Sequence, residues 1–290
     1  MIGRITQRAV SDSALRGLQA SLDRSARLQE QLSSGRRISQ PSDDPSGTAS
    51  AMTFRSQRAS AEQHLRNIDG AQGRLNVTDA AIGDLSARLA KVRELALASR
   101  NGALSTEGRS ALGAEVTAIR GNVVDIYNTR YLDRPVFGGT VAGDAAVDGA
   151  GAYVGDDAPV VVRISRDATV RVDVRGTDVA ADSVPALLDQ IAAEVASAGG
   201  ITDASLDALD AARSTVLNAI GDIGARASRV ESAKVQVDSL RLDLQGRISE
   251  NEDIDLPETI MNLQAQQVAY QSALGAAAKI LQTSLADFLK

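Results

Sequence analysis

The segment "LDALDAARSTVLNAIGDIGARASRVESAKVQVDSLRLDLQGRI", residues 206–248, carries an apolar stripe that advances in alternating steps of three and four residues. Ten of the thirteen stripe positions hold Leu, Ile, Val or Ala, and Arg213, Lys234 and Arg241 hold the other three. This spacing is typical of a coiled-coil seam, and a helix of this length needs a partner to bury its stripe. The segment therefore predicts a long helix packed along another long helix.

Further helical patterns lie on both sides of the chain's middle. Apolar residues at helical spacing predict helices over residues 14–32, about 45–100, 184–198 and 257 to the end. One more helix, with Ser105 as its N-cap, is marked by a four-three apolar step. Its stripe residues are Leu112, Val116, Ile119, Val123 and Ile126.

The middle of the chain has a different pattern. "VVVRIS" (160–165) and "TVRVDVR" (169–175) alternate apolar and polar residues, which predicts a β-hairpin with its turn at residues 165–168 and its polar positions facing out. Residues 138–159 before the hairpin are rich in Gly, Ala and Asp, and Gly199 and Gly200 end the short helix that follows it. Helices therefore flank a small β-rich piece.

These patterns predict a mainly α fold, in which long antiparallel coiled-coil helices from both chain ends form a rod and a small β-rich domain is inserted in the middle. We expect residues 1–40 and 255–290 to be terminal helices that pair with each other in an assembly layer. Residues 41–135 and 203–254 would form the helical rod core, and residues 136–202 the inserted domain.

Composition excludes several classes of function. The 290 residues include no Cys and no Trp, and the 31 basic and 37 acidic residues are interspersed to a net charge of -6. Without Cys there are no disulfides and no thiolate sites, and without a basic stripe we expect no nucleic-acid partner. No segment is long and apolar enough for insertion into a membrane, and the N-terminal residues lack the apolar core of a cleaved secretory signal.

The sequence also gives little sign of catalysis. His64 is the single histidine, so no two-histidine metal face or Ser-His-Asp set can be built, and we interpret it as a helix residue. "GAGAYVG" (149–155) lacks the spacing of a phosphate-binding loop and is interpreted as a turn. We expect no catalytic residue, no cofactor and no metal.

"SQPSDDPSG" (39–47) poses the question of whether Asp43 and Asp44 are a catalytic pair or mark a joint between helices. Gly35 suits a helix C-terminus, Asp44 suits the N-cap of the next helix, and Pro45 suits its first position. The joint is therefore the favoured interpretation, with Arg36 and Arg37 as candidate ion-pair partners of the two aspartates.

Four stretches resemble the flagellin superfamily. "QEQLSSGRRISQPSDDPSGTASA" (29–51) is similar to its N-terminal signature, and the C-terminal tail has its D…I…L…Q…L run at Asp255, Ile260, Leu263, Gln266 and Leu274. Four features look more like its hook-filament junction members than like filament flagellins: the proline-bracketed aspartates, "RNIDGAQGRLNVTDAAI" (66–82), "RYLDRPVFGGT" (130–140) and this C-terminal tail.

The resemblance implies a structural, non-enzymatic subunit of the bacterial flagellum, located outside the cell at the hook-filament junction. It implies type III export with a dedicated chaperone, and assembly as a ring of identical subunits between hook-associated protein 1 and flagellin. Filament flagellin is the nearest alternative, a soluble coiled-coil adaptor is a more remote one, and a metal enzyme is the remotest.

Mechanistically, we expect the terminal helices to fold when they assemble, because few aromatic residues give them little burial of their own to offset ordering entropy. Plain intramolecular core is the competing interpretation of their apolar stripes. The candidate assembly residues are Leu15, Leu18, Leu22, Leu274, Leu281, Leu285 and Phe288. The candidate joint residues are Gly35, Arg36, Ile38, Asp43, Asp44 and Pro45.

Overall fold

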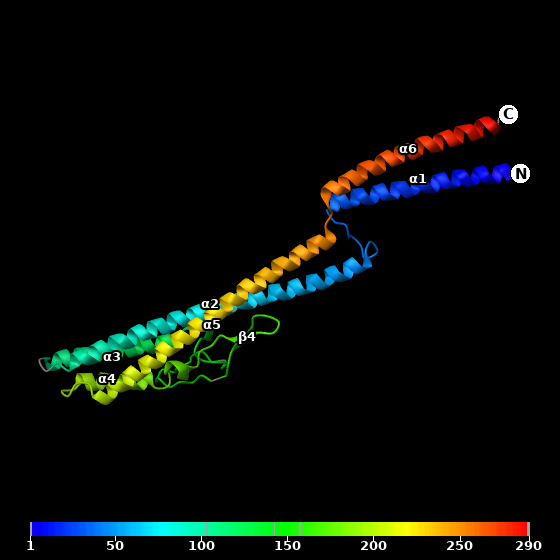
Figure 1. The fold of residues 1–290 in the computed structure, drawn as a ribbon. Helices are drawn as coiled ribbons and strands as arrows, with labels where there is room; N and C mark the ends of the chain where they lie inside the picture. Colours follow the sequence, from blue (N-terminus) through cyan, green and yellow to red (C-terminus); the bar gives the residue numbers. More distant parts are fainter. Residues whose placement is uncertain (1, 102–103, 142, 157, 289–290) are drawn as a thin grey trace. The chain divides into compact units, whose positions relative to one another are not determined.

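Long helices dominate the chain (Figure 1). The computed structural model describes residues 2–101, 104–141, 143–156 and 158–288. Near the two ends, before residue 12 and after residue 278, we describe the backbone only. The helices are α1 (Ile2–Ser34), α2 (Pro45–Ser99), α3 (Thr106–Tyr127), α4 (Val184–Ala196), α5 (Asp203–Glu252) and α6 (Leu256–Phe288). The strands are β1 (Arg130–Tyr131), β2 (Arg134–Pro135), β3 (Val161–Arg163) and β4 (Thr169–Arg171), and a 3₁₀ turn, η1, spans Gly176–Val179. The mainly α prediction is confirmed.

The chain divides into two compact units. The terminal unit comprises Met1–Ala59 and Leu242–Lys290, and the middle unit comprises Ser60–Arg241. Both boundaries fall inside continuous helices, α2 and α5. The expected division into an assembly layer, a rod core and an insert concerns an assembly rather than a single chain, so it stays a prediction.

The predicted seam of α5 is confirmed, because every one of its stripe positions is buried or half-buried. In the middle unit its partner is α2, which runs antiparallel to it: Arg93 Nε donates to Asp210 Oδ1 at 2.7 Å, and Lys234 Nζ lies 2.9 Å from Asp69 Oδ1. The large α2 residues at the centre of this core are at most 1% exposed. They are Ile68, Leu75, Ile82, Leu85, Leu89 and Val92.

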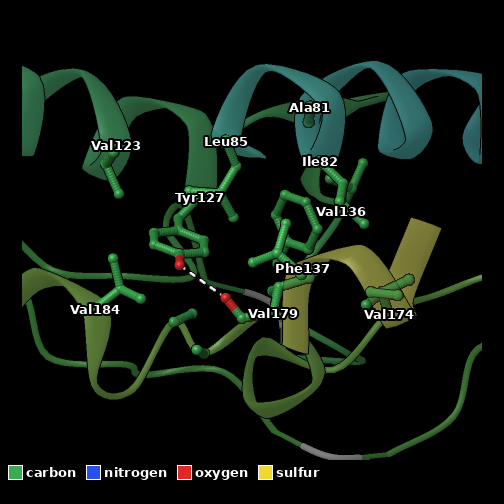
Figure 2. Packing of buried hydrophobic residues seen from close by; sticks show 14 of the residues in the cluster. Ala81, Ile82, Leu85, Val123, Tyr127, Val136, Phe137, Val174, Val179 and Val184 are labelled. Atoms are coloured by element: carbon green, nitrogen blue, oxygen red, sulfur yellow. Dashed lines mark hydrogen bonds between the residues drawn. The ribbon is translucent and has the colours of Figure 1, made fainter. Parts of the chain in front are cut away.

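The largest buried side chains close one region of this core (Figure 2). Phe137 follows the β1–β2 hairpin and meets Tyr127 of α3 edge-on, with ring centroids 6.1 Å apart and planes at 82°. The Tyr127 hydroxyl donates to Val179 O at 2.8 Å, so the one polar atom of the buried ring has a partner. Burial raises the pKa of Tyr127, which keeps the phenol protonated as that donor.

The predicted hairpin is present as β3 and β4, which pair antiparallel with Val162 opposite Val170. The expectation that its polar positions face out is wrong at Asp173, which is fully buried. Its carboxylate accepts from Val160 N at 2.7 Å and pairs with Arg171 at 2.5 Å, and its carbonyl accepts from Arg226 of α5. A buried carboxylate persists because it is paired and hydrogen-bonded, and alternation alone carries no sign of such partners.

A carboxylate also closes the connection from α4 to α5. Glu194 accepts from Thr202 N at 2.9 Å, from Ser205 Oγ at 2.7 Å and from Gln190 Nε2 at 2.9 Å. Thr202 in turn caps the helix, because its hydroxyl accepts from Ser205 N. Burial opposes the charge on Glu194, yet these hydrogen bonds outweigh it and lower the pKa of Glu194 to about 2.

This carboxylate predicts a pH dependence of stability. A lowered folded-state pKa stabilises the fold above the ordinary value of 4.5, and that contribution is lost as pH falls through about 2. Between these values we expect the wild-type unfolding midpoint to fall more steeply with acid than that of Glu194→Gln. Urea unfolding at pH 7, 4.5 and 3 measures the difference, with Glu115→Gln on the exposed face of α3 as the matched control. If the unfolding midpoint fell equally steeply with acid in Glu194→Gln and in Glu115→Gln, Glu194 would not be a cause of the pH dependence.

Candidate functional site

The terminal helices α1 and α6 lie side by side in antiparallel orientation, as the sequence predicts (Figure 1). Their facing residues are small or polar more often than large. Near the middle of the pair, Gln266 Nε2 donates to Ser21 Oγ at 2.7 Å, and Ser21 is 5% exposed. Beside this contact runs a groove whose lining includes alanine on both helices and Gly17 on α1. The pair thus buries little apolar surface, in keeping with a chain poor in aromatic residues.

The predicted assembly residues divide into three groups. Leu18 is half-buried and lines the groove between α1 and α6. Leu15, Leu22 and Leu274 are 54%, 48% and 50% exposed. The side chains of the remaining three lie outside the described ones, although their backbone belongs to α6. They are Leu281, Leu285 and Phe288.

The exposed leucines are part of longer apolar faces. Leu15 and Leu22 are seven residues apart and therefore lie on one side of α1. On α6, Ile260 lies on the same side as Leu274, and Met261 and Val268 form a second exposed line, at 63% and 62% exposure. Large apolar side chains exposed along one side of a helix are candidates for contact with another protein. Intramolecular core therefore accounts for Leu18 but not for Leu15, Leu22 or Leu274.

The joint is built by two hydrogen-bonded aspartates that have different tasks. Asp43 Oδ2 accepts from Ser39 N at 3.0 Å and Gln40 N at 2.9 Å, which closes the turn before α2. Asp44 Oδ1 accepts from Gly47 N at 2.9 Å, so Asp44 is the N-cap of α2 and Pro45 its first residue. Hydrogen bonds from backbone amides lower the pKa of both carboxyls. Both carboxylates therefore stabilise the turn and the start of α2.

The segment after Gly35 pairs with the end of α5, which the sequence did not reveal. Gly35 has φ +71°, the left-handed conformation that lets α1 end. The backbone of Arg36 then forms an antiparallel β-bridge with that of Asp253, and Arg37 N donates to Glu252 O at 2.6 Å. Ile38 is buried at 8% exposure, so it anchors this short extended segment.

Side chains reinforce the same pairing. Arg37 donates to Asn251 O at 2.7 Å and to Asp44 Oδ2 at 3.3 Å, so the expected Arg37–Asp44 pair is present. The Asn251 side chain donates to Gly47 O at 2.7 Å. Glu252, 4% exposed, pairs with Arg55 of α2 at 2.5 Å. The acidic run "SENEDID" (249–255) opposite Arg36 and Arg37 was the sequence signal that could have indicated these contacts.

Capping by Asp44 makes a prediction for stability. Asp44→Ala removes the acceptor for the Gly47 amide in the first turn of α2 and is expected to destabilise the terminal unit by about 1 kcal/mol. Asp44→Asn keeps a capping oxygen and should recover most of that loss. Thermal unfolding of the two variants measures the effect. If Asn proved as damaging as Ala, the charge pair with Arg37 would matter more than the cap.

The described residues offer no centre for metal or redox chemistry. They contain no group of three or more His, Cys, Asp or Glu side chains placed to hold a metal ion. His64 is half-buried on α2 and contacts Ser60 Oγ at 3.5 Å. None of the helices, as far as they are described, has the length and hydropathy to cross a membrane.

The helical regions at both ends of the chain match a known protein family. The bacterial flagellin N-terminal helical region matches residues 5–142, and the bacterial flagellin C-terminal helical region matches residues 206–289. The chain belongs to the bacterial flagellin family. It is therefore a structural protein of the flagellum, and its family is not a class of enzymes.

Relatives of this flagellin-family chain include a hook-associated protein and flagellins. It is 24% identical to flagellar hook-associated protein 3 of Salmonella typhimurium over 178 residues, which cover 61% of this chain and 56% of the Salmonella protein. It is 25% identical to flagellin FlaB1 of Treponema pallidum over 245 residues, which cover 84% of each chain. Sequence identity alone does not separate the two kinds of protein.

Solved structures share the fold. A protein from Vibrio parahaemolyticus described as a flagellar hook-associated protein superposes with a TM-score of 0.64 at 22% identity, over 73% of this flagellin-family chain and all of the other. Flagellar hook-associated protein 3 from Legionella pneumophila gives 0.61 at 12% identity, over 69% and 98%. At these identities the likeness establishes the fold and nothing further.

Proposed function

We propose that this chain is the subunit that joins the flagellar hook to the filament, and that its terminal helices complete their folding when subunits assemble. The observation that carries the proposal is the apolar surface left exposed on α1 and α6, chiefly Leu15, Leu22 and Leu274. A neighbour that covers these leucines supplies the burial that the thin helix pair lacks. The partners would be further copies of this chain, hook-associated protein 1 and flagellin.

The junction role is favoured over the filament role by the sequence of the joint and of the β1–β2 segment. "QPSDDPSG" (40–47) and "RYLDRPVFGGT" (130–140) resemble the junction proteins, and a hook-associated protein 3 is among the relatives. Export through the flagellar type III apparatus with a dedicated chaperone follows from the same role. The protein would reach the outside of the cell unfolded, and the absence of Cys suits that route.

Hydrogen exchange on the purified chain tests the folding mechanism. In the free protein we expect fast amide exchange in α1 and α6 and slow exchange at the buried positions of α2, α3 and α5. After assembly, α1 and α6 should become protected. Uniform protection of the free chain to both ends would contradict coupled folding and favour a self-contained coiled-coil adaptor.

A seeding assay separates the junction role from the filament role. Filament flagellin should elongate a filament seed by itself, whereas a junction subunit should bind hook ends and stop. We expect the purified chain to add to hooks that carry hook-associated protein 1 and then to allow flagellin to polymerise. Continuous growth of filaments from this chain alone would assign it to the filament.

A further inference from the structure

The sulfur atoms of the described residues all lie in the terminal unit, in two methionine side chains. The chain has three Met, no Cys and no Trp. Met52 of α2 and Met261 of α6 belong to the terminal unit, and Met1 lies outside the described residues. Thiols and thioethers are the side-chain groups that oxidants modify most readily. A peroxide is therefore expected to modify the terminal unit and to leave the middle unit unchanged.

Both of these methionines are open to solvent. Met52 is 64% exposed and Met261 is 63% exposed, although folded proteins usually bury methionine. The susceptibility of a sulfur atom to oxidation follows its exposure. We therefore expect the two thioethers of the free chain to react with peroxide at similar rates.

The surroundings of the two methionines differ. Val268, seven residues after Met261 and 62% exposed, lies on the same side of α6. That side points away from α1, because Gln266 faces α1 and Val268 is turned from it by about 200°. The exposed residues three and four positions from Met52 on its own helix are Ala49, Arg55 and Ser56. Met261 thus belongs to an apolar line on a terminal helix, whereas Met52 lies among small and polar residues.

Oxidation changes the character of the apolar line on α6. Hydrogen peroxide transfers one oxygen atom to the thioether: the O–O bond breaks, an S–O bond forms, and the second oxygen leaves as water. The sulfur loses two electrons and the peroxide gains them. The product, methionine sulfoxide, is polar and carries a hydrogen-bond acceptor where the thioether was apolar. Removing this acceptor from water without a donor is unfavourable.

We propose that Met261 is an oxidation-sensitive site, and that its sulfoxide prevents the free chain from being incorporated into the flagellum. This inference rests on the proposed assembly through the exposed apolar side chains of α1 and α6. Met52 has the same chemistry and nearly the same exposure but lies outside the terminal helices. Its oxidation therefore leaves incorporation unchanged, which makes it the matched control.

The reaction is measured first, on the full chain before any assembly. Hydrogen peroxide is added in stages, and mass spectrometry of proteolytic peptides quantifies the sulfoxide at each methionine. We expect Met52 and Met261 to react at rates within twofold of each other, and peptides of the middle unit to gain no oxygen. The thermal unfolding midpoint should not move, because both thioethers are already in water. If Met261 reacted at least tenfold more slowly than Met52, its sulfur would not be accessible and the proposal would be overturned.

Two leucine variants then assign the effect on incorporation, because leucine replaces methionine with little change in volume and has no sulfur. Each chain is oxidised, the peroxide is removed, and binding to hook ends is measured. We expect binding of the wild type and of Met52→Leu to fall at least tenfold, and binding of Met261→Leu to stay within twofold of its untreated value. Methionine sulfoxide reductases and a dithiol should restore binding of the wild type.

The outcomes separate this inference from the proposed function. An equal fall in Met261→Leu, or normal binding of the fully oxidised wild type, would overturn the role of Met261 and leave the proposed function standing. If the untreated wild type failed to bind hooks that carry hook-associated protein 1, the proposed function and this inference would both be contradicted.

Discussion

Replacing Leu22 and Leu274 together by aspartate is expected to abolish incorporation of the chain into the flagellum and to leave the free protein folded. Both side chains are about half exposed in the single chain, at 48% and 50%, so the monomer loses little when they become polar. In the assembly each buried leucine contributes about 1.5–3 kcal/mol. An aspartate at the same place would have to be buried without a partner, which costs more than the leucine contributed.

The measurement has two parts. Circular dichroism and thermal unfolding of the purified variant should match the wild type, and the amount of protein bound to isolated hook ends should fall below detection. Leu217→Asp is the matched control, because Leu217 is 54% exposed on α5 and lies outside the terminal helices. Normal incorporation of the double variant would refute assembly through the terminal helices. An equal defect in the control would show that the effect is not specific to them.

Helix periodicity made most of the fold predictable from the sequence. The stripe of α5 was fully specified, because heptad spacing forces one side of a long helix to be buried. The end of α1 at Gly35 and the start of α2 at Asp44 followed from local rules that need no knowledge of the rest of the chain. The antiparallel pairing of α1 with α6 followed from apolar stripes at both ends.

Contacts between distant segments were not predictable in the same way. The pairing of Arg37 with Asn251 joins residues 214 positions apart, and no periodicity records it. Asp173 occupies an outward position by alternation but is buried, because Arg171 of β4 and the Val160 amide both donate to its carboxylate. Likewise, one stripe of α1 predicted Leu15, Leu18 and Leu22 together, and only the presence of α6 separates the half-buried Leu18 from the two exposed residues.

Phe137→Ala is expected to produce the largest loss of stability in the middle unit. The ring is fully buried, meets Tyr127 edge-on, and lies among residues of α2, α3 and the β segments (Figure 2). Removing it deletes the apolar contacts and leaves a cavity that the long helices cannot collapse to fill. Substitutions of this kind cost about 3–5 kcal/mol, a large part of the stability of an ordinary domain.

Tyr127→Phe separates the packing from the hydrogen bond in this core. It removes the donor to Val179 O and keeps the ring, so it should cost about 1 kcal/mol. Urea unfolding followed by circular dichroism measures both variants, and we expect the midpoint of Phe137→Ala to fall several times further than that of Tyr127→Phe. Similar small losses in both would mean that the aromatic pair contributes little, and that the α2–α5 seam alone stabilises the middle unit. The larger loss at Phe137 would instead show that the segment after the β1–β2 hairpin is an essential part of this core.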